Sequence, residues 1–267
     1  MLIDFHTHCF PDAIAERAVT KLAGIGGIPH YTIATLDDNI RMMDKCGIDI
    51  SVVCSIATNV KQQTNVNNFA IQLNSHPRMR ALGSVHPDCP YEKACAELER
   101  IKAAGLKGIK VHPDYMDAYL DDDRFMRIFE KCDKLGLFVI THAGYDFYSP
   151  DNPHATPERI LNVSKAFPSL RLIAAHIGSN RMCDRVLSLL VGRENLWFDL
   201  SLIAIEPNPI ELVKEIILTH SPKRLLFASD LPWCDPSVEF KVIEDLGLDA
   251  DLMENIKYKN ALKLLGE

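Results

Sequence analysis

The sequence predicts an α/β protein built as a closed (β/α)8 TIM barrel, and two patterns carry that prediction. Eight short apolar runs alternate with longer segments of helical spacing from one end of the chain to the other. Each run is apolar at consecutive positions, which is typical of parallel strands covered on both faces. Two architectures are compatible with strands and helices that alternate in this way, a closed barrel and an open doubly wound sheet. A count of eight strands favours the barrel.

The predicted strands lie at residues 2–5, 48–56, 80–85, 108–111, 137–141, 170–175, 196–200 and 225–228. No glycine-rich phosphate-binding motif follows any of them, so the doubly wound alternative lacks its usual signature. A chain of 267 residues matches the ~250 residues at which such barrels remain one domain. We therefore expect residues 1–267 to form a single domain.

Glycine, proline and capping residues mark the ends of the predicted helices. Gly47 ends a helix over residues 39–46, Gly136 ends one over 125–135, and Thr156 precedes one that opens with Pro157. Further helices are expected over residues 92–104, 180–191, 209–219 and 238–246, with a last one from Asp251 that Glu254 completes as a capping box. The glycine-rich stretch 23–34 is predicted to be irregular, hypothetically a lid, and residues 145–156 to form a wall of the barrel mouth.

Composition narrows the class of partner. A formal net charge of -7 argues against a nucleic-acid partner, which would call for clustered lysine and arginine. The eight cysteines are scattered with no C-x-x-C pair, so reduced thiols are expected rather than disulfides or a cysteine zinc site. Neither a signal peptide nor a membrane-spanning segment is recognisable. We expect a cytoplasmic protein with a small-molecule substrate and no membrane partner, and the sequence leaves open whether it forms a homo-oligomer.

The positions of the histidines are the most informative feature. Six of the ten stand in or at the C-terminal end of a predicted strand, namely His6, His8, His86, His112, His142 and His176. In a barrel these ends converge on the face where active sites of this fold are built. Ionisable groups that end apolar strands cost desolvation unless they have a task. The other four, His30, His76, His154 and His220, are expected at the surface.

A metal site is predicted where the first and last strands meet. His6 and His8 are two residues apart in an extended segment, so their side chains point the same way and can share one ion. Asp230 follows the eighth strand, which barrel closure places beside the first. His142 would add a third imidazole from the fifth strand. The alternatives are a core histidine satisfied by backbone for His142 and a helix N-cap before Pro232 for Asp230.

Three more residues are candidates for a second metal or for substrate. His176 ends the sixth strand and is either a second-metal ligand or a general acid or base. Lys110 and His112 are two residues apart at the end of the fourth strand and share a face. Lys110 is an anchor for substrate, an oxygen ligand bridging two metals if it is carbamylated, or a lysine whose stem crosses the barrel rim.

Five pieces of the chain, in order from residue 4 to residue 230, carry a family resemblance. They are Asp4-Phe5-His6-Thr7-His8, Gly108-Ile109-Lys110-Val111-His112-Pro113, Thr141-His142-Ala143-Gly144, Ala175-His176 and Ser229-Asp230. Together they resemble the amidohydrolase superfamily, and more narrowly its amidohydrolase-2 branch of predicted metal-dependent TIM-barrel hydrolases. That branch also contains aminocarboxymuconate semialdehyde decarboxylase and related enzymes. The resemblance is specific for the superfamily and leaves the substrate open.

The resemblance implies roles for individual residues. The family's metal ligands are matched here by His6, His8, His142 and Asp230. His176 matches a histidine that is catalytic in mononuclear members and binds the second metal in binuclear ones, and Lys110 matches a position carbamylated in some binuclear members. One or two divalent ions are therefore implied. Zinc is the expected ion from the ligand types, and manganese or iron would fit nearly as well.

The implied reaction is metal-dependent hydrolysis of a small substrate, such as one that carries a carboxylate. Asp230 is expected to take the proton of the attacking water, and His176 and Lys110 to hold the developing oxyanion. The first alternative is a non-oxidative decarboxylase of a small unsaturated or aromatic acid, with His176 delivering the proton. The second is a structural metal centre in a non-enzymatic binding protein, which is less favoured because structural zinc is normally closed and tetrahedral.

Overall fold

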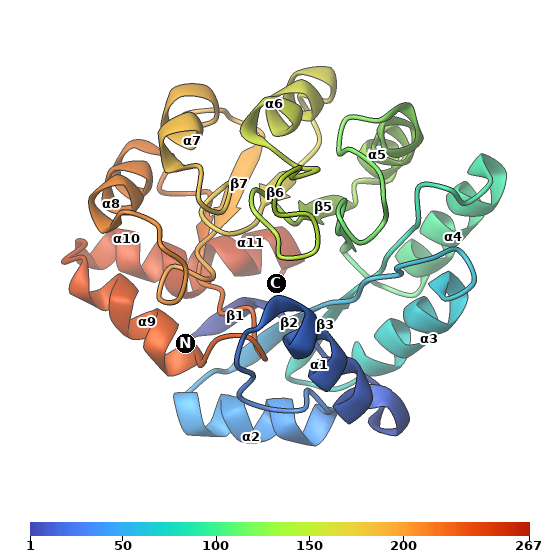
Figure 1. Ribbon diagram of the computed structural model, residues 1–267, viewed down its shortest axis with the longest axis horizontal. Helices are drawn as coiled ribbons and strands as arrows, with labels where there is room; N and C mark the ends of the chain where they lie inside the picture. The colour runs from blue at the N-terminus through green and yellow to red at the C-terminus, as the bar shows by residue number, and fades with distance from the viewer.

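Eight parallel strands lie at the centre of the computed structural model, which describes residues 1–267 (Figure 1). They are β1 (Ile3–Thr7), β2 (Ile50–Cys54), β3 (Met79–Leu82), β4 (Gly108–Val111), β5 (Phe138–Thr141), β6 (Leu172–Ala174), β7 (Leu196–Asp199) and β8 (Leu225–Leu226). Each of the eight predicted apolar runs overlaps one of these strands. Nearly all of their residues are buried, as expected for strands covered on both faces.

Backbone hydrogen bonds join the strands into a ring. The ladders run β1–β2–β3 and β4–β5–β6–β7–β8, all parallel. At the seam between β3 and β4, the Lys110 amide donates to the carbonyl of Gly83 (2.8 Å). At the seam between β8 and β1, the Asp230 amide donates to the carbonyl of His6 (2.8 Å). The predicted barrel is confirmed, and its closure places the end of β8 beside the end of β1.

All helices except α11 lie around the outside of the strands (Figure 1). The helices are α1 (Asp12–Gly26), α2 (Leu36–Cys46), α3 (Gln63–Leu73), α4 (Tyr91–Ala103), α5 (Asp123–Leu135), α6 (Pro157–Ala166), α7 (Cys183–Leu189), α8 (Ile210–Thr219), α9 (Pro236–Asp245), α10 (Ala250–Glu254), the π-helical η1 (Asn255–Lys259) and α11 (Asn260–Leu265). The inward face of α5, Phe125, Ile128, Phe129 and Cys132, follows the spacing of one helical stripe. None of these helices combines the length and the apolar character needed to span a bilayer.

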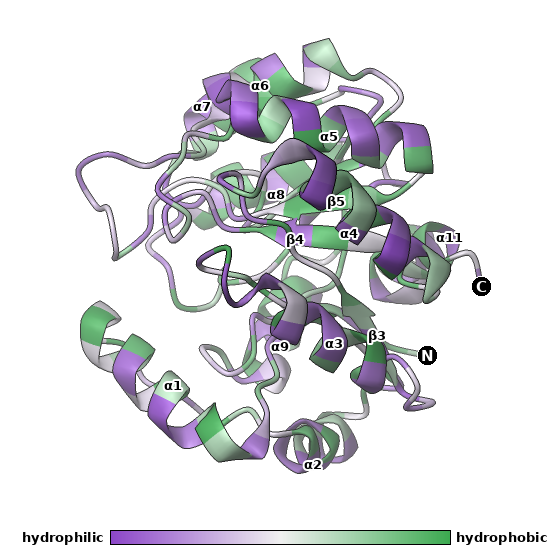
Figure 2. Ribbon diagram, turned by 90° about the vertical axis from the view of Figure 1, so that its right-hand side faces the viewer, coloured by the Kyte–Doolittle hydropathy of each residue, from purple (hydrophilic) through white to green (hydrophobic).

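The barrel interior is filled with side chains, and α11 seals one end. A cluster of buried residues inside the barrel includes Phe5, Phe138 and Trp197 from three strands, together with Leu264 and Leu265 of α11. Burying an aromatic or aliphatic side chain of this kind stabilises the fold by about 1.5–3 kcal/mol. Figure 2 shows both chain ends on this side of the barrel, with α1 and the long loops on the other. The mouth is therefore the loop-lined end.

Two helix boundaries differ from the prediction because of local backbone conformation. Helix α1 continues to Gly26 and ends at Gly27, which has a left-handed φ of 62°, so only the later part of the stretch 23–34 is irregular. The helix expected over residues 180–191 begins at Cys183. Arg181 has a φ of 60°, which breaks the helix before that point.

Two further expectations were wrong. The helix at residues 250–254 is capped by Asp249, which accepts a hydrogen bond from the Leu252 amide (2.8 Å), and not by Asp251. His220 is buried, not at the surface, and its ring stacks on that of Phe198 with centroids 4.2 Å apart. In the chain His220 directly follows α8, and its Nε2 lies 3.2 Å from the carbonyl oxygen of Leu196, so the ring is held against β7.

Glu239 of α9 is a buried carboxyl group that ties together the segments after β7 and β8. Its Oε1 accepts a hydrogen bond from the Ile203 amide (2.7 Å), and the Cys234 thiol lies 3.3 Å from Oε2. Burial raises the pKa of Glu239 to about 8 against an ordinary value of 4.5, although these hydrogen bonds work in the opposite direction. The folded state therefore holds this proton more tightly than the unfolded chain does.

We predict that Glu239→Gln flattens the pH dependence of stability. Because the pKa is raised in the folded state, the stabilisation is complete below pH 4.5 and is lost as the pH rises through about 8. At about 1.4 kcal/mol per pKa unit, the contribution of Glu239 to the free energy of unfolding differs by a few kcal/mol between low and high pH. Urea unfolding of the wild type and Glu239→Gln at pH 5, 7 and 9 measures it. Parallel stability curves for the two proteins would refute this role of the carboxyl group.

Candidate active site

Three predicted ligand residues meet at the mouth of the barrel. The Nε2 atom of His8 lies 3.0 Å from Oδ1 of Asp230, and Nε2 of His6 lies 3.4 Å from the same oxygen. His6 and Asp230 are buried, and His8 is nearly so. These three residues form one of the groups whose ligand atoms are close enough to hold a metal ion. The structure therefore brings His6, His8 and Asp230 together as expected, and their role as ligands stays a prediction.

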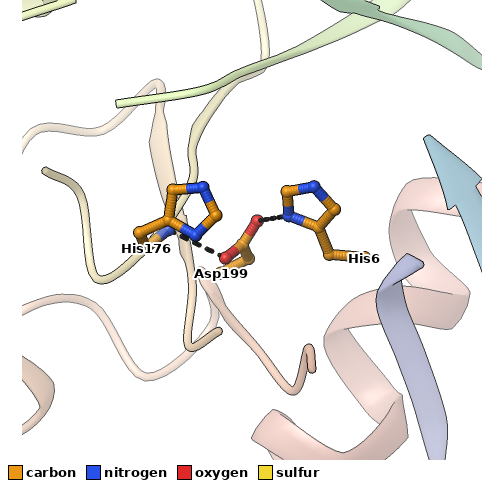
Figure 3. A group of neighbouring side chains, drawn as sticks. All are labelled: His6, His176 and Asp199. Atoms are coloured by element: carbon orange, nitrogen blue, oxygen red, sulfur yellow. Dashed lines mark hydrogen bonds and ion pairs between the residues drawn. The ribbon is translucent and has the colours of Figure 1, made fainter. Parts of the chain in front are cut away.

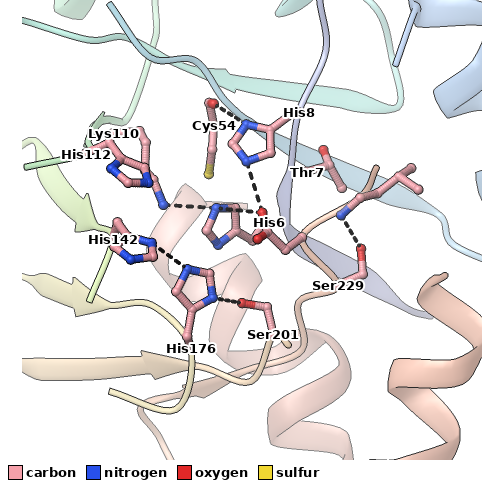
Figure 4. A network of polar contacts seen from close by, with 12 residues as sticks. His6, Thr7, His8, Cys54, Lys110, His112, His142, His176, Ser201 and Ser229 are labelled. Carbon is pink, nitrogen blue, oxygen red and sulfur yellow. Dashed lines mark hydrogen bonds and ion pairs between the residues drawn. The ribbon is translucent and has the colours of Figure 1, made fainter. Parts of the chain in front are cut away.

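The hydrogen bonds on the far side of each ring fix which nitrogen carries the proton. Nδ1 of His6 lies 2.9 Å from a carboxylate oxygen of Asp199 (Figure 3), and Nδ1 of His8 lies 3.0 Å from the carbonyl oxygen of Cys54 (Figure 4). A carbonyl oxygen only accepts, and so does an ionised carboxylate, so each Nδ1 donates and each Nε2 presents a lone pair. Together with Oδ1 of Asp230, the two Nε2 atoms make three acceptor atoms that converge on one point. A divalent ion with imidazole and carboxylate ligands fits this donor set.

Lys110 brings a positive charge to the same point. Its Nζ lies 2.9 Å from Nε2 of His6, and the residue is 1% exposed. An ammonium group has three N–H donors, and the ring of His6 is its one hydrogen-bond partner in the protein. Two donors therefore remain for a ligand. Of the three interpretations of Lys110, a lysine whose stem merely crosses the rim is wrong, because the side chain is buried in the site.

His142 and His176 form the next layer of the site. Nδ1 of His142 lies 3.0 Å from Nε2 of His176, whose ring stacks on that of His6 with centroids 5.3 Å apart. His142 is not among the atoms grouped around Asp230 and lies one imidazole further out. Burial lowers the pKa of His176 well below its ordinary value, and the neighbouring His142 lowers it further. His176 is therefore a neutral imidazole at neutral pH.

Asp199, at the end of β7, organises both histidine layers (Figure 3). One oxygen bonds Nδ1 of His6, and the other accepts from the His176 amide (2.9 Å) and from the Ser201 hydroxyl (2.6 Å). That hydroxyl also lies 2.8 Å from Nδ1 of His176. Burial would raise the pKa of Asp199, but its interactions with His6, His176 and Lys110 together outweigh burial and hold the pKa well below its ordinary value. Asp199 is therefore an ionised acceptor.

The sequence analysis missed Asp199, although the signal was present. It stands one residue before the end of the apolar run of residues 196–200, much as Asp230 follows the eighth strand. Asp146 was missed for a different reason, because it lies in the loop after β5, where no strand periodicity applies. Asp146 forms a further group of metal-binding type with His112 and His142. His112 thus faces His142, whereas its predicted neighbour Lys110 faces His6. His86 has no contact with this cluster.

Two of the site residues have a strained backbone. His176 has a φ of 57°, the β-branched Ile177 a φ of 56°, and Asp230 a φ of 62°. This left-handed region is uncommon for residues other than glycine and is an outlier for a β-branched residue. Such strain persists only where the surroundings impose it, and it clusters at functional sites. At Asp230 the surroundings include Asp4, which accepts hydrogen bonds from the Ser229 hydroxyl (2.5 Å) and amide (3.0 Å).

The fold and these side chains define a class: (β/α)8 barrels with an imidazole and carboxylate cluster at the mouth, suited to a divalent metal. The family model described as Amidohydrolase matches residues 3–266. The chain therefore belongs to the amidohydrolase family, as the sequence motifs indicated. No curated protein matches the chain.

Solved structures show the same fold over the whole chain. An uncharacterised TIM-barrel protein from Bordetella bronchiseptica has a TM-score of 0.80 at 19% identity, covering 99% of this chain and 98% of that one. A dihydroxybenzoic acid decarboxylase from a Polaromonas species, with bound manganese and the inhibitor 2-nitroresorcinol, has a TM-score of 0.72 at 17% identity, covering 99% and 96%. A probable 2-pyrone-4,6-dicarboxylic acid hydrolase from Acinetobacter baumannii with bound citric acid has 0.69 at 17% identity, covering 100% and 99%.

We predict that Gly144→Ala strongly destabilises the protein. Gly144 lies two residues after His142 with a φ of 87°, and a Cβ there would lie 2.3 Å from both the backbone nitrogen and the oxygen of Asn180. The segments after β5 and β6 would have to separate, at a cost of about 2–4 kcal/mol. The matched control is Gly24→Ala in α1, where nothing lies within 4 Å and stability should rise by about 0.5–1 kcal/mol. Equal stabilities in urea would contradict the prediction.

Proposed function

We propose that this chain is a metal-dependent hydrolase that acts on a small, carboxylate-bearing substrate in the cytoplasm. The observation that carries the proposal is the convergence of three acceptor atoms, Nε2 of His6, Nε2 of His8 and Oδ1 of Asp230, at the mouth of the barrel. Zn²⁺ is the expected ion, with Mn²⁺ or Fe²⁺ as alternatives. When bound, such an ion acidifies water and polarises the bond to be cleaved.

Asp230 is the proposed general base. Its carboxylate is buried and is held at the centre of the acceptor group by the His6 carbonyl and by the strained backbone. It would take the proton of the attacking water and then pass it to the leaving group, a relay within the reach of one side chain. A carboxylate that both binds the ion and moves the proton needs this fixed position.

His176 and Lys110 divide the remaining tasks. Asp199 accepts the Ser201 proton, so the Ser201 oxygen accepts from Nδ1 of His176, and Nε2 of His176 presents a lone pair. His176 then suits a proton acceptor or a second-metal ligand, rather than the oxyanion donor of the sequence-based mechanism. Lys110 supplies the donors, since the ring of His6 is its one hydrogen-bond partner in the protein and its N–H groups can turn to the substrate carboxylate or the developing oxyanion.

Non-oxidative decarboxylation is the second candidate, favoured by the decarboxylase with bound manganese among the structural neighbours. In that reaction the C–C bond to the carboxylate breaks, CO₂ leaves, and a proton is added to the carbon. His176 would have to deliver that proton, and its lowered pKa works against this at neutral pH. A purely structural metal centre has less support, because only three donors converge where closed structural zinc takes four.

We predict one bound metal per chain, and none after Asp230→Ala. Elemental analysis of protein purified without chelator measures it. Lys110→Ala and His176→Ala should keep the one ion, because both residues face substrate in the proposal. His86→Ala is the matched control, a buried histidine in the loop after β3 and outside the site. Two ions in the wild type falling to one in Lys110→Ala or His176→Ala would establish a binuclear centre, and no metal in any protein would refute the metal site.

We also predict that activity on small carboxylate-bearing esters, lactones or amides releases acid and no CO₂. A chelator should abolish this activity, and Zn²⁺ or Mn²⁺ should restore it, because the ion supplies the activated water. The same panel includes aromatic and unsaturated acids assayed for CO₂. Release of CO₂ with no hydrolysis would replace the hydrolase assignment with the decarboxylase one.

A further inference from the structure

Asp4 is a buried carboxylate that takes no part in the proposed reaction. It lies in β1, two residues before His6, and its exposed fraction is 0%. Its Oδ1 accepts hydrogen bonds from the amides of His6 (3.2 Å) and Ser229 (3.0 Å), and its Oδ2 accepts one from the Ser229 hydroxyl (2.5 Å). Three donors therefore converge on this carboxylate, and two of them belong to the residue that precedes Asp230.

The hydroxyl of Ser229 extends this contact to the other side of Asp230. Its oxygen accepts a hydrogen bond from the Leu231 amide (3.1 Å; Ser229 is labelled in Figure 4). Because a backbone N–H can only donate, the hydroxyl proton is directed to Asp4, and both bonds have one direction. We call Asp4 and Ser229 the β1–β8 clamp. The clamp holds the residues before and after Asp230 with a single carboxylate.

The backbone of Asp230 needs this support. Its φ of 62° lies in the left-handed region, and such a conformation persists only where the surroundings impose it. Two backbone bonds hold the segment against β1, from the Asp230 amide to the His6 carbonyl (2.8 Å) and from the His8 amide to the Leu231 carbonyl (2.7 Å). The clamp bonds the amides of Ser229 and Leu231, and the φ and ψ rotations of Asp230 lie between these two amides. It therefore restricts the two rotations that the other bonds leave less constrained.

The direction of the Asp230 side chain depends on the same two rotations. Its Oδ1 lies 3.0 Å from Nε2 of His8 and 3.4 Å from Nε2 of His6. A change of φ to the usual negative range would redirect the Cβ of Asp230 and would move the carboxylate away from the two rings. The three acceptor atoms would then no longer meet.

We propose that Asp4 is a positioning residue, which acts through Ser229 to keep Asp230 in its left-handed conformation with Oδ1 toward His6 and His8. Its hydrogen bonds go to backbone amides and to one hydroxyl, so it acts on the acceptor group only through the chain. The inference rests on the proposed function, in which Asp230 binds the ion and moves the proton.

The test uses the full chain, stripped with a chelator and titrated with Co²⁺, whose visible absorption reports the ligands. Asp4→Asn places an N–H donor where an oxygen now accepts, and Ser229→Ala leaves the Leu231 amide without its partner. Each should weaken Co²⁺ binding by roughly tenfold, the lower end of the usual cost of losing a residue that orients a ligand. Each should also change the spectrum of the fully loaded protein. The double variant should bind about as weakly as Asp4→Asn alone, because both substitutions break one path.

The matched control is Ser164→Ala. It removes a buried serine hydroxyl that donates to Oδ1 of Asn195 (2.7 Å), before β7 and therefore at the end of the barrel opposite the mouth. Thermal unfolding of all variants measures their stability, and Ser164→Ala should lower it while Co²⁺ affinity and spectrum stay unchanged. If Asp4→Asn does not fold, Ser229→Ala alone decides the question.

Wild-type Co²⁺ affinity and spectrum in Ser229→Ala would overturn the inference while the proposed function stands. An equal loss of affinity in Ser164→Ala would also overturn it, because the effect would then follow from lower stability. A wild type that binds no Co²⁺ would overturn the proposed function together with the inference.

Discussion

The buried carboxylate of Asp199 is the interaction on which the rest of the site depends. It is fully enclosed and bonds the ring of His6, the backbone of His176 and the hydroxyl of Ser201. An ionised group in such surroundings is tolerated only when its acceptor sites are filled. The same bonds fix which nitrogen carries the proton on two imidazoles, those of His6 in β1 and of His176 after β6. The need of one buried carboxylate for hydrogen-bond donors therefore sets the direction of every hydrogen bond in the network.

The site combines an excess of acceptor atoms with one buried cation. Nε2 of His6, Nε2 of His8 and Oδ1 of Asp230 face one another, and the ammonium group of Lys110 bonds only to His6. In a low-dielectric interior such an arrangement strongly favours positive charge among the acceptors. The barrel can maintain this arrangement of acceptors and cation because the strands beneath the site are rigid and exclude water. The unusual backbone angles at the edge of the site are imposed by packing.

The eight strands and the meeting of His6, His8 and Asp230 could be predicted, since apolar runs and barrel closure are properties of sequence order. The sequence also held the signal for Asp199, a charged residue near the end of an apolar run. Asp146 could not be found in this way, because it lies in a loop whose course depends on packing between segments. The start of α7 depends on a single left-handed residue, Arg181, which helix periodicity does not reveal.

The pairing of β8 with β1 has a consequence for biogenesis. His8 and Asp230 are 222 residues apart in the chain, so the ribosome makes one partner long before the other. Leu264 and Leu265, which seal the interior, emerge later still. A cation-binding centre made from both halves cannot mature while the nascent chain is incomplete. At the proposed metal site, an ion could therefore bind only after translation has nearly finished, when cellular metal availability would decide which ion is acquired.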